Sequence, residues 1–167
     1  MRTALKQRII GTITVSFDRT FGRLSYPIHL RVYRFTRGFI GHRSPAGPML
    51  ILTSTGRKSG IERSNGLLYL EREGSYYVVA SNGGRENNPR WLYNVRHEPH
   101  VKVQVGSKSF DATAHVLDKR ERAVAWPTMT TFYPGWAHYE TLTDRPLQVI
   151  RLDPIDLNLP SPPAEGA

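Results

Sequence analysis

The sequence has no cysteine among its 167 residues. This absence excludes a disulfide framework, a thiolate metal site and a cysteine nucleophile. The histidines are scattered without the paired spacing of metal ligands, so we predict no metal site. No apolar run approaches the roughly 18 residues of a membrane-spanning helix. The basic, briefly apolar start is not followed by a small-residue cleavage site, so we expect mature protein in the cytoplasm.

Acidic residues are scarce in only one part of the chain. The formal net charge is +9. Up to Arg43 there are nine Lys and Arg residues against the single acid Asp18, whereas the other 124 residues carry 14 cations and 13 acids. The excess positive charge therefore belongs to the N-terminal segment, and it does not indicate that the rest of the chain binds nucleic acid.

Residues 1–43 have the pattern of a basic amphipathic helical extension. Apolar residues recur there at the helical period, in two stretches separated by Tyr26 and Pro27: Leu5, Ile9, Ile13, Phe17 and Phe21, then Ile28, Val32, Phe35 and Phe39. Such helices can cover the core of the domain, lie on an anionic membrane surface or bind nucleic acid. We expect no nucleic acid, and we keep a peripheral position on the inner face of the cell membrane as a possibility.

Strand patterns dominate from Met49 onward. Six strands are predicted at residues 49–55, 62–73, 75–81, 100–105, 109–117 and 147–152, and helices at 89–98, 118–133 and 135–142. Pro89 suits the first helical position, Asp118 suits an N-cap, and Pro127 is expected to kink or interrupt its helix. The predicted fold class is mainly β with α (α+β): a barrel of about six mostly antiparallel strands with flanking helices, at residues 44–154. The Pro-rich residues 155–167 are predicted to be a disordered tail.

The stretch "TSTGRKSGIERSNG", residues 53–66, places Arg57, Lys58 and Arg63 around two glycines. Such a turn can gather several N–H donors at one point and hold a phosphate or a carboxylate. The same residues also suit an ordinary solvated hairpin turn, in which glycine supplies a positive φ and the cations keep the turn soluble. The spacing of a Walker phosphate-binding loop is absent, because only three residues separate the glycines of "TGRKSG".

Four ordered blocks carry a family resemblance: "LILTSTGRKSGIERSNGLLYL", "YYVVASNGGRENNPRWLYNVRHEPHVKVQV", "YPGWAHYETLTDR" and "LQVIRLDP". Together they resemble the deazaflavin-dependent nitroreductase family over about Met49 to Pro154. The resemblance implies a split β-barrel that uses coenzyme F420 and transfers hydride from the reduced coenzyme to an activated alkene, quinone or nitro compound. Two alternatives are a coenzyme-binding barrel without turnover and a relative that uses FMN. A small-molecule electron acceptor is the expected partner, and the choice between a monomer and a homodimer stays open.

The resemblance also implies roles for individual residues. The expected coenzyme-binding residues are Arg57, Lys58, Arg63, Asn65, Leu68, Ser81, Asn82, Gly83 and Trp136. The expected catalytic residues are Tyr139, Ser81 and Tyr133, with Tyr139 or solvent as proton donor, and Trp91 is expected to anchor the core. The chain departs from the family pattern at four of its positions: Asn82 replaces a lysine, Trp136 a tyrosine, Gly66 a proline and Leu68 a residue that is often tyrosine.

Overall fold

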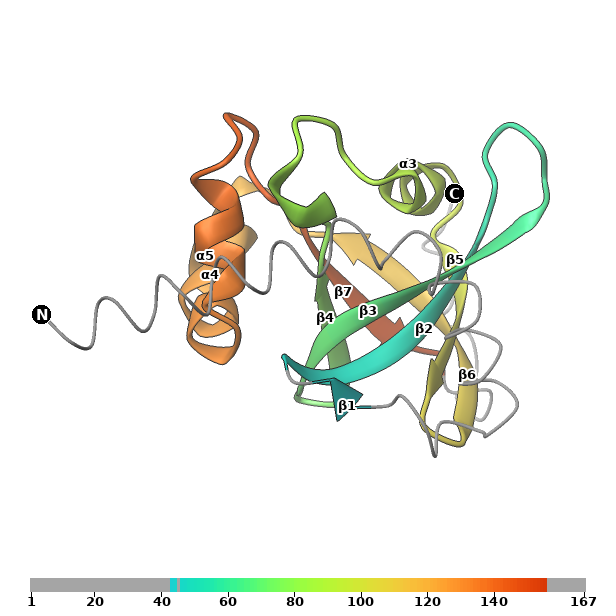
Figure 1. The fold of residues 1–167 in the computed structure, drawn as a ribbon. Helices are drawn as coiled ribbons and strands as arrows, with labels where there is room; N and C mark the ends of the chain where they lie inside the picture. Colours follow the sequence, from blue (N-terminus) through green and yellow to red (C-terminus); the bar gives the residue numbers. More distant parts are fainter. Residues whose placement is uncertain (1–42, 45, 156–167) are drawn as a thin grey trace, which may run out of the picture.

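The computed structural model describes residues 43, 44 and 46–155, and its centre is a closed barrel of six antiparallel strands (Figure 1). The order around the barrel is β2 (Gly47–Thr55), β3 (Glu62–Arg72), β4 (Ser75–Val79), β7 (Val149–Pro154), β6 (Lys108–Val116) and β5 (His100–Val105). β5 pairs with β2 in the register Leu50↔Val105 and closes the barrel. The short strand β1 (Arg43–Ser44) pairs with the start of β2.

The flanking helices lie on two sides of the barrel in Figure 1. α3 (Arg90–His97) lies near one end of the barrel, and α4 (Lys119–Phe132) and α5 (Gly135–Glu140) lie together beside it. A 3-10 turn, η1 (Asn82–Gly84), follows β4 and contacts α5. The barrel strands therefore need apolar side chains on their inner side and also on the outer side that α4 and α5 cover.

Alternate residues of the strands supply those two faces, because successive side chains of a strand point to opposite sides. On β3, Leu67 and Tyr69 pack against the barrel core, whereas Leu68 and Leu70 pack against a second cluster that includes Met129 of α4. β4 and β7 divide in the same way between the two clusters. Burial on both faces explains why "GLLYL" and "YYVVA" are continuous apolar runs rather than alternating ones.

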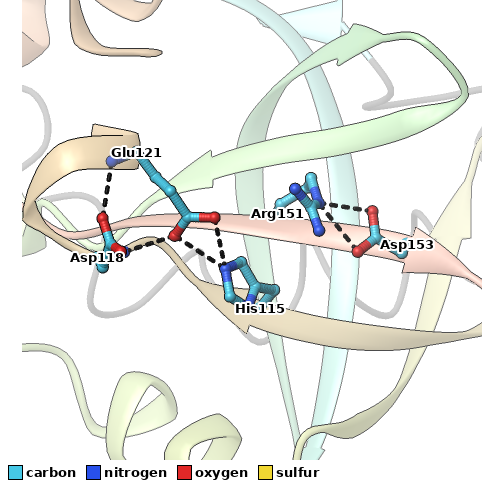
Figure 2. A network of polar contacts seen from close by, with 5 residues as sticks. All are labelled: His115, Asp118, Glu121, Arg151 and Asp153. Carbon is cyan, nitrogen blue, oxygen red and sulfur yellow. Dashed lines mark hydrogen bonds and ion pairs between the residues drawn. The ribbon is translucent and has the colours of Figure 1, made fainter. Parts of the chain in front are cut away.

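The N-terminus of α4 carries a complete capping box, which Figure 2 shows. The Glu121 N–H donates to Asp118 Oδ1 at 2.8 Å, and the Asp118 N–H donates to Glu121 Oε2 at 2.8 Å. His115 Nε2 on β6 lies 2.9 Å from the same Glu121 oxygen. Because two otherwise unpaired N–H groups are satisfied and one carboxylate reaches β6, this end of α4 is tied to the barrel.

The structure confirms the predicted α+β fold class with its six antiparallel strands, and it confirms the Asp118 cap. Two local predictions are wrong. Pro127 does not interrupt α4, although a kink there stays a prediction. Pro89 caps α3 with an extended ψ of 147° rather than forming its first helical residue. A proline inside a helix loses one hydrogen bond, and here the packing of α4 on the barrel outweighs that loss.

The predicted extension at 1–43 and the predicted tail at 155–167 fall almost wholly outside the described residues and stay predictions. Within the described part of the chain, every helix is too short or too polar to cross a bilayer.

Candidate functional site

The basic stretch forms the turn between β2 and β3, which extends from the barrel close to α3 (Figure 1). The Gly60 N–H donates to the Gly56 carbonyl at 2.8 Å, and the Gly56 N–H donates to the Ile61 carbonyl at 3.0 Å. Gly60 has a φ of +66°, and a Cβ on Gly56 would lie 2.9 Å from the Ile61 carbonyl oxygen. The two glycines therefore permit a compact turn whose exposed tip carries Arg57 and Lys58.

Asn94 of α3 fixes this turn to the barrel. Its Oδ1 accepts from the Arg57 backbone N–H at 3.2 Å, and its Nδ2 donates to Ser54 Oγ of β2 at 3.2 Å. Asn94 is 8% exposed. A buried amide with both ends hydrogen-bonded is well suited to hold two elements in one geometry, because leaving either end unpaired costs free energy.

Between the turn and α3 lies an open hollow of ≈ 610 Å³. Its lining contains four cations, and no acidic residue occurs among the described residues that line it: Gly56, Arg57, Lys58, Ser59, Arg63, Ser64, Asn65, Arg90, Trp91, Tyr93 and Asn94. A similar hollow beside α4, of ≈ 590 Å³, has Arg72, Arg120 and Arg151 balanced by Glu73, Asp118 and Glu121. Only the first of these two hollows therefore has the charge of an anion site.

The cations of this hollow are available for a ligand. Within the described part of the chain, no carboxylate forms an ion pair with Arg57, Lys58, Arg63 or Arg90. Glu62, next to Arg63, instead bonds to Lys102 Nζ of β5 at 2.7 Å. This hydrogen bond and the Glu62 charge raise the pKa of Lys102 above its ordinary value. The acid adjacent to the turn is thus engaged elsewhere, and the positive potential of the hollow is retained.

Three residues of α3 were missed by sequence reasoning: Arg90, Tyr93 and Asn94. The Arg57 guanidinium lies 5.3 Å from the centroid of the Tyr93 ring, within the range of a cation–π contact. A signal was present, because residues three and four apart lie on one face of a helix. Arg90, Tyr93 and Asn94 have this spacing, so a basic and polar face opposite the buried Trp91, Leu92 and Val95 was predictable.

The second group of predicted residues lies in the loop after β4. Asn82 and Gly83 have φ values of +50° and +62°, and Ser81 is half-buried. Ser81 Oγ has no hydrogen-bond partner among the described residues. Asn82 Nδ2 donates to the Asn87 carbonyl at 2.8 Å. The Asn82 amide is therefore used within the loop itself.

The third group is an aromatic cluster on α4 and α5. Trp136 is 3% exposed and Tyr139 is 7% exposed, while Tyr133 and Leu68 pack partly buried against the same core. The rings of Tyr133 and Trp136 meet edge to face at 5.4 Å. A Cβ on Gly135 would lie 2.5 Å from the Tyr133 hydroxyl oxygen, so this close ring placement requires glycine there.

The structure thus divides the predicted site residues among three places. Arg57, Lys58, Arg63 and Asn65 line the cationic hollow. Ser81, Asn82 and Gly83 form the loop that contacts α5, and Leu68, Tyr133, Trp136 and Tyr139 belong to the second apolar cluster. Trp91 is 5% exposed in the barrel core and also reaches the hollow, so its predicted core role is confirmed.

Comparisons with known proteins agree on one family. Residues 25–154 match the model of the F420H(2)-dependent quinone reductase family. An F420H(2)-dependent quinone reductase of Mycobacterium tuberculosis strain H37Rv is 35% identical over 139 residues, which cover 81% of this chain and 93% of that protein. A solved F420-H2 dependent reductase is 40% identical with a TM-score of 0.59, over 64% of this chain and 94% of that one.

A further solved structure, described as a domain-swapped dimer, is 34% identical with a TM-score of 0.61 and covers 77% of this chain and 98% of its own. The predicted deazaflavin family, the split-barrel fold and the choice of F420 ahead of FMN are confirmed by these matches. The chain belongs to the F420H(2)-dependent quinone reductase family, an oxidoreductase family whose coenzyme is F420.

Proposed function

We propose that the protein binds reduced coenzyme F420 with its cationic hollow and loop and reduces a quinone or another activated acceptor, such as an alkene or a nitro compound, by hydride transfer. The observation that carries this proposal is the hollow with four cations and no described acid, on a chain that belongs to an F420-dependent family. A relative from Mycobacterium tuberculosis is named a quinone reductase, which favours a quinone as the acceptor.

The residues of the hollow fit the anionic part of this coenzyme, which carries a phosphate and a polyglutamate tail. Arg57, Lys58 and Arg63 would hold the phosphate region, and Arg90 adds a fourth cation on the α3 side. Each charge-assisted hydrogen bond contributes about 1.5–3 kcal/mol. Asn94 supports these contacts because it fixes the turn before any ligand arrives, which reduces the ordering cost of binding.

The remaining predicted residues would lie beside the deazaflavin ring, the part of the coenzyme that reacts. When bound, the reduced coenzyme supplies a hydride. Ser81 Oγ is free to donate a hydrogen bond toward the ring, and the aromatic cluster of Tyr133, Trp136 and Tyr139 would exclude water beside it. Tyr139 would hold the proton that accompanies the hydride, with solvent as the alternative donor.

Two of the departures from the family pattern favour a second candidate, a coenzyme-binding barrel without turnover. Asn82 replaces a cation and is bonded to the Asn87 carbonyl, and Trp136 replaces a tyrosine hydroxyl at a buried position. Following the reoxidation of reduced F420 with a menaquinone analogue and a nitroimidazole separates the two. Saturable binding with no turnover across a broad acceptor panel would establish the second candidate.

The binding half of the proposal is tested by titrating F420 into an Arg57→Ala/Lys58→Ala variant. Losing two charge-assisted contacts should weaken binding about 100-fold or more. The matched control is Lys119→Ala/Arg120→Ala, which removes two adjacent cations from the first turn of α4. We expect this control to bind like the wild type. Unchanged affinity in the Arg57/Lys58 variant would move the anion site elsewhere, and absence of wild-type binding even at high micromolar coenzyme would refute the proposal.

Two partner predictions belong to the same proposal. A homodimer is supported by the similar structure that is described as a domain-swapped dimer. Cytoplasmic location with peripheral attachment through residues 1–43 is supported by the charge of that segment.

A further inference from the structure

One guanidinium, that of Arg145, joins the segment before β7 to the loop after β4. Its Nε donates to the Arg85 carbonyl at 2.9 Å, and its Nη2 donates to the Ser81 carbonyl at 2.7 Å. Its Nη1 donates to the Ala80 carbonyl at 3.2 Å and to Asn88 Oδ1 at 2.9 Å. A single side chain therefore makes four hydrogen bonds, all of them to residues 80–88.

The same segment holds this loop at further points. The Ala80 N–H donates to the Gln148 carbonyl at 2.9 Å, so both backbone groups of Ala80 are bound by residues 145–148. Thr143 Oγ1 donates to Glu86 at 3.3 Å and accepts the Arg145 N–H at 3.3 Å. Arg145 is half-buried, and this burial lowers the pKa of its guanidinium.

The loop gains from such support because its sequence leaves several conformations open. Asn82, Gly83 and Gly84 all have positive φ values, of +50°, +62° and +73°. Glycine adopts positive φ without steric cost and Asn tolerates it better than most residues, so the sequence permits this conformation. Two adjacent glycines also permit others, and contacts from outside the loop restrict it to this one.

We propose that Arg145 is a positioning residue that holds residues 80–88 in the conformation that presents Ser81, Asn82 and Gly83 to the coenzyme. This inference rests on the proposed function. Arginine suits the role because its planar fork carries five donors in fixed directions and so reaches carbonyls on several sides of one plane. Lysine keeps the charge but lacks the fork, so it cannot reproduce the four contacts.

The test compares F420 affinity of the wild type, Arg145→Lys and the control Arg151→Lys. Arg151 is a half-buried arginine of β7 that binds Asp153 at 2.9 Å and does not contact the loop. Affinity is measured well below the melting temperature, so that every variant is folded. Under this condition a substitution that only lowers the stability of the fold leaves the F420 affinity unchanged. We expect about tenfold weaker binding for Arg145→Lys, as expected when hydrogen bonds of a charged donor are lost, and wild-type binding for Arg151→Lys.

Hydrogen exchange without coenzyme supplies a second readout. In Arg145→Lys the amides of residues 82–88 should exchange faster, whereas those of β2 and β5 should not change. If Arg145 variants do not fold, Asn88→Ala removes a single acceptor and should weaken binding by about threefold. Wild-type affinity together with unchanged exchange in the variant would overturn the inference. A wild type that binds no coenzyme would instead refute the proposed function, and the exchange data would still decide whether Arg145 orders the loop.

Discussion

Gly84 is the point at which the loop after β4 touches α5. Its φ is +73°, and a Cβ there would lie 2.8 Å from the Tyr139 carbonyl oxygen and 3.0 Å from Leu142 Cβ. Both the backbone conformation and the close approach therefore require glycine. Tyr139 and the loop are both expected to lie beside the deazaflavin ring. The contact at Gly84 therefore also sets the distance between them.

We predict that Gly84→Ala lowers the free energy of unfolding by about 2–4 kcal/mol, from the left-handed conformation and the overpacking together. Gly74→Ala is the matched control, since Gly74 has a φ of +79° and open space around it. The control should lose only the conformational part, about 1–2 kcal/mol. Urea unfolding measures both variants, and equal losses would show that the contact with α5 contributes nothing.

Single residues also show how far the site was predictable. Arg57, Lys58 and Arg63 could be grouped from the sequence because they stand on one short turn beside two glycines, and the structure places all three on one hollow. Arg90 and Asn94 could not be joined to them by local pattern, since about 30 residues separate the two segments and only the tertiary fold brings α3 against the turn. Arg145 lies still further along the chain, and an isolated arginine in "TLTDRP" carries no signal of the four contacts it makes.

The hydrogen bonds of the α4 capping box lead to a prediction about stability at acid pH. Glu121 accepts the Asp118 N–H and also contacts His115, and these two hydrogen bonds, the first being the stronger cause, hold the pKa of Glu121 below its usual value. A carboxyl with a lowered pKa in the folded state stabilises the protein above its unfolded pKa. That contribution is lost as the pH falls through the lower, folded pKa.

We therefore predict that Glu121→Gln melts at a lower temperature than the wild type at neutral pH, and that the two melting temperatures converge as the pH falls below about 4. Glutamine retains an acceptor for the Asp118 N–H, so the substitution isolates the charge. Glu71→Gln, at an exposed position of β3, is the control and should follow the wild type at every pH. A constant difference between Glu121→Gln and the wild type from neutral to acid pH would contradict the prediction.

The strands and helices themselves were largely predictable, for a physical reason. Residues of β3 and β4 are buried on both faces, so their apolar runs are long and bounded by clear turns such as Glu73 and Gly74. The continuation of α4 through Pro127 was not predictable, because it depends on burial of residues such as Met129 against the barrel, which the local sequence does not reveal.

The uneven distribution of charge along the chain leads to a prediction about membranes. Nearly all of the +9 net charge lies in residues 1–43, where cations accompany apolar residues spaced at the period expected of a helix. Each Lys or Arg near an anionic lipid surface contributes about 1 kcal/mol of binding free energy. Residues 46–155 carry 14 Lys and Arg against 11 Asp and Glu, and we propose that the cationic hollow of this part binds the coenzyme.

We predict that the full chain sediments with phosphatidylserine vesicles at low salt and that a Lys6→Gln/Arg8→Gln variant binds them about 30-fold more weakly, corresponding to about 2 kcal/mol for two charges. Lys119→Gln/Arg120→Gln removes the same charge from α4 and should bind like the wild type. Saturating F420 should not displace the vesicles if the two anionic ligands use separate surfaces. Equal weakening by both double variants, or displacement by the coenzyme, would place the lipid contact on the barrel and refute its assignment to residues 1–43.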